Sequence, residues 1–533
     1  MRIVTAGFVL AVLWVTCCAG GHFKIFLRMA GFGDFSLGIV NALPFMANLG
    51  QIAAGMLVER TGLKKYQFVQ CGSASRAMWL LVALVPLALP IPSPTAVVAV
   101  LVLMASSHLV GSLSGAAWFT WMGDLIPRRI RGRYLGNRQR YALLVRIPFV
   151  MALGAAVDAA RQDGLPETFA AQPNLFYLCC AIIAVGAVLG TIDILLFLRI
   201  REVLPSHRST PEQPLAPRPK MPRVRDVVIT PMRDPAFRPV ALYGACIAFA
   251  ASSGGLFFWA NASERLGFSY LALNLLLLAF GPIFGMLSAR WWGRLIDRWG
   301  TRTALMVATT GTLLAIAHWF ISTPDTPAPP LVIPAVNAVI GAFNALLAAV
   351  WPGDPPWAMG TLTAAMPVGA YLLTMLGCVA GGISWTGVEL AQTNLRFSFA
   401  DNATGRGRYV AASLAYMGLG GTLGGLAGGL AAWAFQPLHN HPIGPFQWNN
   451  WHAAFALSLA ARLVGLGVAA GMGDPGRPPV GQFVRVMRSS IYNAVLPPLL
   501  WPVRRIGARR QRRRDEQGPY GGRGGDDDRP GRP

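Results

Sequence analysis

The chain has 533 residues, 54% of them hydrophobic and 13% charged, and its mean hydropathy of +0.46 excludes an ordinary soluble protein. The formal net charge of +23 alone would suggest a nucleic-acid partner. The placement of the basic residues excludes that partner, because nearly all of them fall in alternate loops and in the C-terminal tail. This bias is typical of cytoplasmic loops, so both termini are predicted to lie in the cytoplasm.

Apolar runs of about 20 residues recur along the chain, each long enough to cross a ~30 Å hydrocarbon core as an α-helix. Six spans are predicted at 3–23, 36–58, 67–90, 94–121, 141–160 and 174–198. A cytoplasmic linker at 199–237, rich in Pro and Arg, follows them. Six more spans are predicted at 238–260, 268–290, 303–322, 364–388, 409–435 and 453–472. We expect an all-α integral membrane protein with 12 transmembrane helices, arranged as six-helix bundles at 1–198 and 238–472.

One apolar segment, 331–351, lies outside this scheme and is bracketed by prolines. A single extra crossing would move the basic tail to the outer side, against the charge bias. The segment is therefore predicted to be a re-entrant or surface-lying helical hairpin in the outer loop between helices 9 and 10.

The residues after the last span divide into two parts. Residues 473–505 mix apolar residues with arginines and are typical of an amphipathic segment at the inner interface. Residues 506–533 form a predicted disordered basic tail, which either binds anionic lipid head groups or only reinforces the topology.

A short charged motif occurs twice, each time between two spans. Its first copy consists of Gly55, Glu59, Arg60, Gly62 and Lys64. Its second copy, at the same spacing, consists of Gly293, Asp297, Arg298, Gly300 and Arg302. An Arg-Gly-Arg-Tyr sequence follows each copy, and its arginines are Arg131 and Arg133 in the first half and Arg406 and Arg408 in the second. Repeats of this kind indicate a duplicated unit, as in secondary transporters.

The duplicated motif in a six-plus-six chain resembles the major facilitator superfamily, in particular poorly characterised bacterial members that carry Trp118–Pro127 before Arg-Gly-Arg-Tyr. The resemblance implies two bundles that rock about a central substrate site, with the motif loops at a cytoplasmic gate. It also implies that Glu59 and Arg60 engage the region of Asp124 and Arg133. Asp297 and Arg298 would pair with groups near Arg406 and Arg408. The alternative is that these basic loops only fix orientation.

Ionisable residues within spans are candidates for the transport path, because they are expensive in lipid. By the resemblance, spans 1, 4, 7 and 10 line the cavity. His108 in span 4 either contacts substrate or exchanges a proton, or it is hydrogen-bonded within the bundle. Glu389, close to Trp385 in sequence, either binds a cation or substrate or acts as a gate carboxylate for Arg396.

Aromatic residues in span 7 provide a second candidate surface. Phe257, Phe258 and Trp259 provide a stacking surface and Asn261 one polar group, a mixture that suits sugars or drug-like molecules. An aromatic belt at the outer interface explains the same residues without a ligand.

The leading hypothesis is a secondary transporter that moves a small organic solute and is driven by a proton or sodium gradient. The chain contains no phosphate-binding Gly-x-x-x-x-Gly-Lys-Ser/Thr sequence, which disfavours ATP hydrolysis. A membrane-embedded transferase and a transporter-like sensor are the alternatives. We expect a non-enzymatic monomer in the cell (inner) membrane that contacts lipids and binds no cofactor, metal or nucleic acid.

Overall fold

The structure is a computed structural model, and it describes residues 2–61, 63–125, 131–162, 164–200, 228–350, 363, 366–401, 406–443 and 446–473. Most of the predicted linker at 199–237 therefore lies outside the described residues. The predicted amphipathic segment at 473–505 and the tail at 506–533 lie outside them as well, apart from residue 473. Those three predictions stay predictions.

Within the described residues of the first half, all regular elements are helices. Its elements are α1 (Arg2–Cys17), α2 (Gly21–Met29), α3 (Asp34–Thr61), α4 (Lys64–Ala88), α5 (Pro94–Leu125), α6 (Arg131–Ala160), α7 (Pro173–Leu196) and the 3₁₀ helix η1 (Phe197–Arg199). Helices α1 and α2 meet at a bend of 43°. Gly20 at this bend has a φ of 97°, a conformation that glycine adopts without steric cost.

The second half contains shorter elements and one small sheet. They are η3 (Thr230–Arg233), α9 (Arg238–Gly254), α10 (Phe257–Ala260), η4 (Asn261–Arg265), α11 (Tyr270–Asn274), η5 (Leu275–Phe280), α12 (Gly281–Trp299), α13 (Thr301–Ile321), α14 (Val332–Val350), α15 (Val368–Asp401), α16 (Arg406–Ala434), η6 (Gln436–Leu438), β1 (His441–Ile443), β2 (Phe446–Trp448) and α17 (Trp451–Gly471). Strands β1 and β2 pair antiparallel, with His441 opposite Trp448.

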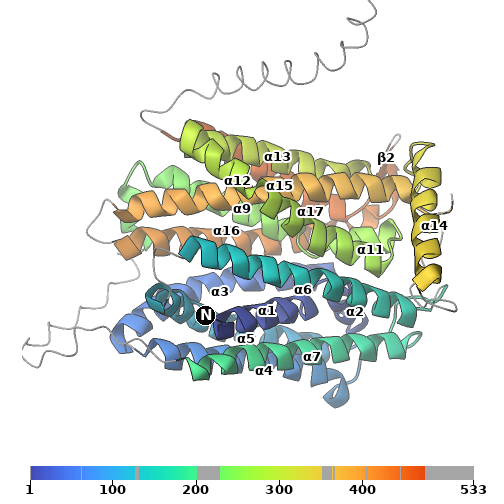
Figure 1. The fold of residues 1–533 in the computed structure, drawn as a ribbon, viewed down its shortest axis with the longest axis horizontal. Coiled ribbons are helices and arrows are strands. Elements are labelled where there is room, and N and C mark those ends of the chain that lie inside the picture. The colour runs from blue at the N-terminus through green and yellow to red at the C-terminus, as the bar shows by residue number, and fades with distance from the viewer. Residues whose placement is uncertain are drawn as a thin grey trace, which may run out of the picture. The chain divides into compact units, whose positions relative to one another are not determined.

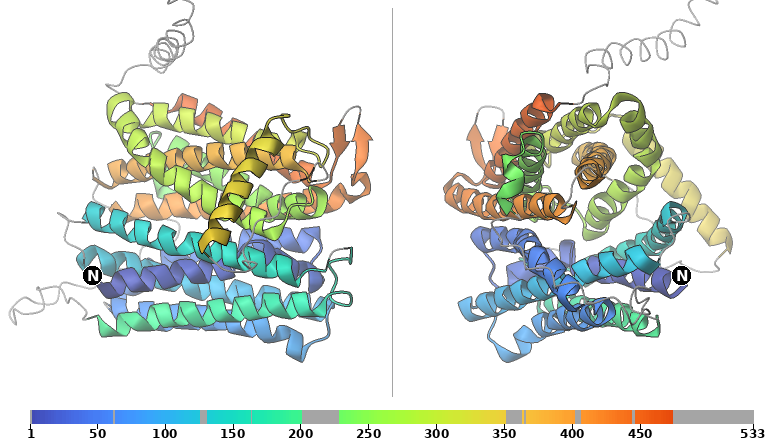
Figure 2. Two further views of the ribbon diagram at one scale, coloured as in Figure 1. Left: turned by 45° about the vertical axis from the view of Figure 1, so that its right-hand side comes forward. Right: turned by 90° about the vertical axis from the view of Figure 1, so that its left-hand side faces the viewer.

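Among the described residues, ten helices are long and apolar enough to cross a membrane, or eleven if α1 and α2 form one bent span. Helices α1–α7 gather in one half of the molecule and α9–α17 in the other (Figure 1). The turned views show the same two groups side by side (Figure 2). The fold is therefore that of a helical membrane protein with two halves.

Helix α16 links the two halves by close packing of glycines. One row of its glycines faces α3 of the first half, and a second row faces α9: Gly418, Gly421, Gly425 and Gly429 in the first row, and Gly420, Gly424 and Gly428 in the second. A Cβ atom on Gly429 would lie 2.7 Å from the Cα atom of Gly38. Only glycine permits such close backbones, which is how helices associate tightly in lipid.

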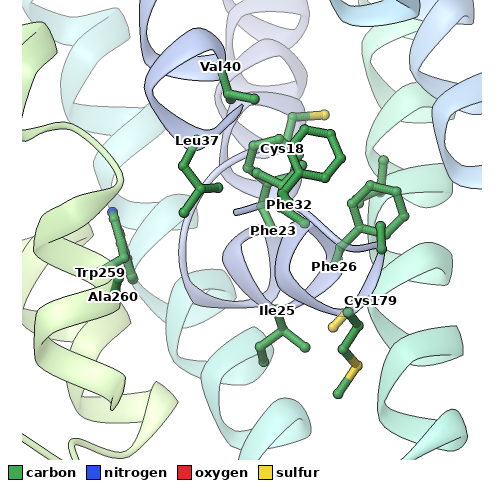
Figure 3. Close-up of a cluster of buried hydrophobic side chains, with 14 of the residues drawn as sticks. Cys18, Phe23, Ile25, Phe26, Phe32, Leu37, Val40, Cys179, Trp259 and Ala260 are labelled. Atoms are coloured by element: carbon green, nitrogen blue, oxygen red, sulfur yellow. The ribbon is translucent and has the colours of Figure 1, made fainter. Parts of the chain in front are cut away.

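An apolar core crosses from one half to the other (Figure 3). Phe23 and Phe26 of α2 are buried in it, and Phe26 stacks on Phe176 of α7 with ring centroids 5.6 Å apart. Trp259 and Ala260 reach the same cluster from α10 in the second half. The halves therefore share buried apolar surface at this level.

Several helices extend beyond the predicted spans. The predicted span 141–160 belongs to α6, which begins at Arg131, and the predicted span 364–388 belongs to α15, which ends at Asp401. A hydropathy pattern marks where the hydrocarbon core ends, whereas a helix can continue into water as long as its backbone stays hydrogen-bonded. The Arg-Gly-Arg-Tyr sequences therefore begin helices, and Glu389 lies well inside α15.

The extra apolar segment forms the single helix α14, where the sequence analysis expected a helical hairpin. Helix α14 lies crosswise to the long helices of both halves (Figures 1 and 2). The antiparallel pair β1–β2 was not predicted, since strands of three residues carry no readable alternation.

Candidate functional site

The two copies of the repeated motif lie at the same end of the molecule. Helix α16 runs antiparallel to α3, because Gly429 contacts Gly38 while Gly421 contacts Phe45. Helix α15 runs antiparallel to α13, because Gly377 contacts His318 while Gly311 contacts Ser384. The α3–α4 and α12–α13 junctions therefore both lie beside the α15–α16 junction. We call this the motif end, and the opposite end, where α3, α11 and α17 begin, the far end.

The structure describes only part of the motif side chains. Gly62 lies outside the described residues, and so do the side chains of Glu59, Arg60, Asp124, Arg131, Arg133, Arg406 and Arg408. Their predicted pairings stay predictions, as do those of Asp297 and Arg298, whose side chains are exposed. In the second copy, Gly300 has a φ of 86° at the sharp turn between α12 and α13. Arg302 donates a hydrogen bond to the carbonyl oxygen of Ala470, which joins α13 to α17.

A cavity of about 710 Å³ lies mainly within the second half. Its wall is built from α6, α10, η5, α12, α13, α15 and α17. Three of its polar lining residues, Gln139, Arg140 and Glu389, are exposed and lie on the stretches of α6 and α15 nearer the motif end. The cavity therefore extends from the middle of the helices towards the motif end.

The deepest polar groups of this cavity are His318 and Arg462. The side chain of Arg462, in the middle of α17, is 4% exposed and donates from Nη1 to the carbonyl oxygen of Thr312, 3.3 Å away. Its guanidinium carbon lies 5.6 Å from the ring centroid of Trp385. The Nδ1 atom of His318 is 2.7 Å from the carbonyl oxygen of Ala315.

Three of the predicted path residues, Phe258, Trp385 and Glu389, line this cavity. The others do not lie in its lining. His108 packs edge-on against Trp79 in the first half, with ring centroids 6.3 Å apart. Trp259 is buried in the shared apolar core, and Asn261 is fully buried in η4. The structure thus brings the predicted residues of span 10 together with Phe258 of span 7, and it separates them from His108, Trp259 and Asn261.

The far end holds a network of ion pairs between the two halves. Glu264 of η4 lies 2.7 Å from Nζ of Lys24 and 3.1 Å from Nε of Arg28, both on α2. Arg28 also pairs with Asp34 at 2.6 Å. Lys24 is 1% exposed, so its charge depends on these partners in place of water. We call Lys24, Arg28, Asp34, Glu167 and Glu264 the far-end network.

Further hydrogen bonds reinforce this closure. Asp158 of α6 accepts the backbone N–H groups of Tyr270 and Leu271 at 2.7 and 2.8 Å. These are among the first N–H groups of α11, which have no partner within their own helix, so Asp158 caps a helix of the other half. The hydroxyl of Tyr270 donates to Glu167. Asn450 at the start of α17 donates to Asp34 at 2.7 Å.

A smaller cavity of about 270 Å³ lies inside the first half. Arg76 stacks on Trp14 there, with its guanidinium carbon 3.2 Å from the ring centroid, and Nη2 lies 3.9 Å from Asp193 Oδ2. This cation has both an aromatic and an acidic neighbour, which suits a structural pair between α4 and α7.

The site therefore consists of a cavity at mid-helix that reaches one end and a charged network that joins the halves at the other end. These features define the class: a helical membrane protein of two halves with a solvent-accessible internal cavity. The Major Facilitator Superfamily model matches residues 168–385. Solved transporters share the fold, and together these matches confirm the resemblance that the repeated motif carries: the chain has the fold of a major facilitator superfamily transporter.

Three of these solved structures each cover 87% or more of this chain. The nucleoside transporter NupG is 13% identical, covers 89% of this chain and 99% of its own, and has a TM-score of 0.56. A D-xylose-proton symporter is 12% identical over 87% and 96%, with a TM-score of 0.53. The inward open xylose transporter XylE from E. coli is 13% identical over 87% and 94%, with a TM-score of 0.51. Identities this low show the fold alone. No curated protein matches the sequence significantly.

Sequence reasoning did not single out Arg462, His318 or the far-end network as functional. A signal existed for Arg462, because an arginine in the centre of a span is a functional candidate by default. The network carries no such signal, since its five members come from four separate segments, and only folding brings them together.

Proposed function

We propose that the chain is a secondary active transporter that moves a small organic solute by alternating access, driven by a proton or sodium gradient. The single observation that carries the proposal is the asymmetry of the two ends. A cavity at mid-helix reaches the motif end, whereas at the far end ion pairs join the two halves and line a separate outer cavity of about 570 Å³. Alternating access requires one such state and its converse, related by a movement of the halves.

The proposal includes 12 transmembrane helices in two six-helix bundles. Helix α3 is 28 residues long and is not among the eleven candidate spans. Counted as a span, it brings the number to twelve. Helix α14 is then the extra segment of the outer loop, lying along the surface of the membrane. With the motif end and both termini in the cytoplasm of a cell (inner) membrane, the described conformation opens inward.

The parts then divide their roles. Trp385 and Glu389 contact the solute, and His108, Trp259 and Asn261 remain candidates for a path that opens in another state. The motif residues Glu59, Arg60, Asp297 and Arg298 lock the cytoplasmic end when the far end opens. The protein acts as a monomer in contact with membrane lipids, without a cofactor or a metal.

Two other functions are weaker. A membrane-embedded transferase needs acids or histidines that converge on one face. The acids at the far end are already engaged by Lys24, Arg28 and backbone N–H groups. A transporter-like sensor would bind solute in the cavity without translocating it.

Uptake by purified protein in proteoliposomes tests the proposal. We expect saturable accumulation of at least one solute in a screen of sugars, nucleosides, carboxylates and cationic drugs, and stimulation by an imposed proton or sodium gradient. A sensor would bind a solute without accumulation. A transferase activity without transport would contradict the proposal.

Labelling from each side of the membrane tests the topology. Cysteines in place of Ala342, exposed on α14, and Arg406, at the start of α16, should react with an impermeant maleimide from opposite sides. Arg406→Cys should react only from the cytoplasm and Ala342→Cys only from outside. External labelling at 406 would refute the proposed orientation.

A further inference from the structure

We infer that the cavity at the motif end binds an organic anion with an apolar body, and that Arg462 is the group that holds its negative charge. This inference rests on the proposed function, because it names the class of the transported solute. It depends on three observations: the isolation of Arg462, the composition of the cavity wall and the charge of the groups around it.

Arg462 is a buried cation whose guanidinium group is not fully hydrogen-bonded. Among the described residues no carboxylate forms an ion pair with it; its partners are the carbonyl oxygen of Thr312 and the ring of Trp385. Its Nε atom is buried without a hydrogen-bond partner. Lys24, the other fully buried lysine or arginine of the described residues, has an acid 2.7 Å away. An unpaired arginine at mid-span is energetically unfavourable in lipid, so an anionic ligand that pairs with it would offset that free energy.

The wall around Arg462 suits the body of an organic molecule. Phe258, Trp319 and Trp385 supply aromatic surface, and Leu276, Met286 and Ile316 supply aliphatic surface. Such a wall with few polar groups is typical of sites for small organic ligands. An inorganic anion has no apolar part that could pack against these aromatic and aliphatic side chains.

The remaining polar groups favour an anion over a cation. Arg140 adds a second positive charge at the mouth of the cavity, whereas Glu389, the one carboxylate among the described lining residues, interacts with Arg396 further along α15. The imidazole Nε2 of His318 is buried without a partner and can donate to or accept from a ligand. A guanidinium binds a carboxylate in a bidentate geometry, which fixes both position and orientation.

Binding to the purified full-length protein tests this inference with matched probes. Benzoate and naphthoate carry an aromatic body and a carboxylate, benzamide has the same body without the charge, and inorganic phosphate has a charge without the body. We expect saturable binding of the two carboxylates by calorimetry, and at least tenfold weaker binding of benzamide and phosphate. Arg462→Gln should weaken carboxylate binding roughly 30-fold, with Arg462→Lys in between.

Arg290→Gln is the control, since Arg290 is an exposed arginine of α12 outside the cavity lining and should leave the affinity unchanged. If the carboxylates do not bind, or bind Arg462→Gln as tightly as the parent protein, the inference is overturned. Uptake of a neutral solute without anion binding would overturn the inference and leave the proposed transport standing. Carboxylate binding that depends on Arg462, without uptake of any solute, would support the anion site and contradict transport.

Discussion

The far end and the motif end of the molecule differ in how the two halves meet. At the far end, α2 and α6 of the first half contact η4 and α11 of the second through Lys24, Asp158 and Glu264. Lys24 is almost fully buried there. At the motif end, the lining residues Gln139, Arg140 and Glu389 are exposed to solvent around a cavity.

This difference between the two ends indicates which interactions stabilise the described conformation. Buried charge pairs are expensive to break, because removal of one partner leaves the other charge without water or a counter-ion. Exposed charges have water as an alternative partner and contribute little. The far-end network should therefore determine what fraction of the molecules is closed at that end. Substitutions at the motif end should mainly affect the other conformation, in which the far end is open.

The largest effect is expected for Glu264→Gln, which removes the acid shared by Lys24 and Arg28. We expect the closed far end to lose about 3 kcal/mol, the lower part of the range for broken buried pairs, because Glu264 is about one-third exposed and Lys24 keeps Glu167 at 3.5 Å. Hydrogen exchange of the Tyr270 and Leu271 amides measures the opening, since both amides bond to the other half.

Asp325→Asn provides the control, because Asp325 is an exposed acid in the loop after α13 and lies apart from the far-end network. Its exchange pattern should match that of the parent protein. Unchanged exchange at Tyr270 and Leu271 in Glu264→Gln would show that apolar packing alone keeps the far end closed.

A smaller effect is expected for Asp158→Ala, which removes the cap that α6 provides for α11. The loss of a helix cap costs about 1 kcal/mol, so exchange of the Tyr270 and Leu271 amides should rise roughly fivefold. Ser269→Ala is the matched control, since Ser269 caps the same helix from within its own half through the N–H of Ala272. If both variants increase exchange at Tyr270 and Leu271 equally, the effect belongs to the helix and not to the contact between halves.

Much of the fold could be predicted from the sequence, because lipid leaves a chain few choices. Apolar runs such as 174–198 must form helices, and the observed α7 (Pro173–Leu196) agrees with that prediction. The duplicated motif predicted the type of fold, since its glycine and charge spacing occurs twice in register. Helix ends were predicted less well, as α15 shows, because hydropathy reports on the membrane and not on backbone hydrogen bonds.

The candidate site was only partly predictable. Trp385 and Glu389 fall within the cavity wall because they lie on one helix at helical spacing, which a sequence displays directly. Contacts such as Lys24 with Glu264 join residues that are far apart in the chain, and the sequence around either residue does not predict its contact with the other. The isolation of Arg462 is likewise a property of its surroundings, which only the packing of α13, α15 and α17 defines.

The smallest effect on stability is expected for Asp297→Asn in the second copy of the motif, and it sharpens the comparison most. Asp297 is exposed at the motif end in this conformation, so the free energy of unfolding should change by no more than about 0.5 kcal/mol. Uptake should nevertheless fall severalfold, because the proposed lock at this end is needed only when the far end opens. Thermal unfolding and proteoliposome uptake, measured on the same preparation, separate the two quantities. A large loss of stability would mean that the motif end is already held together here, and unchanged uptake would mean that Asp297 serves orientation alone.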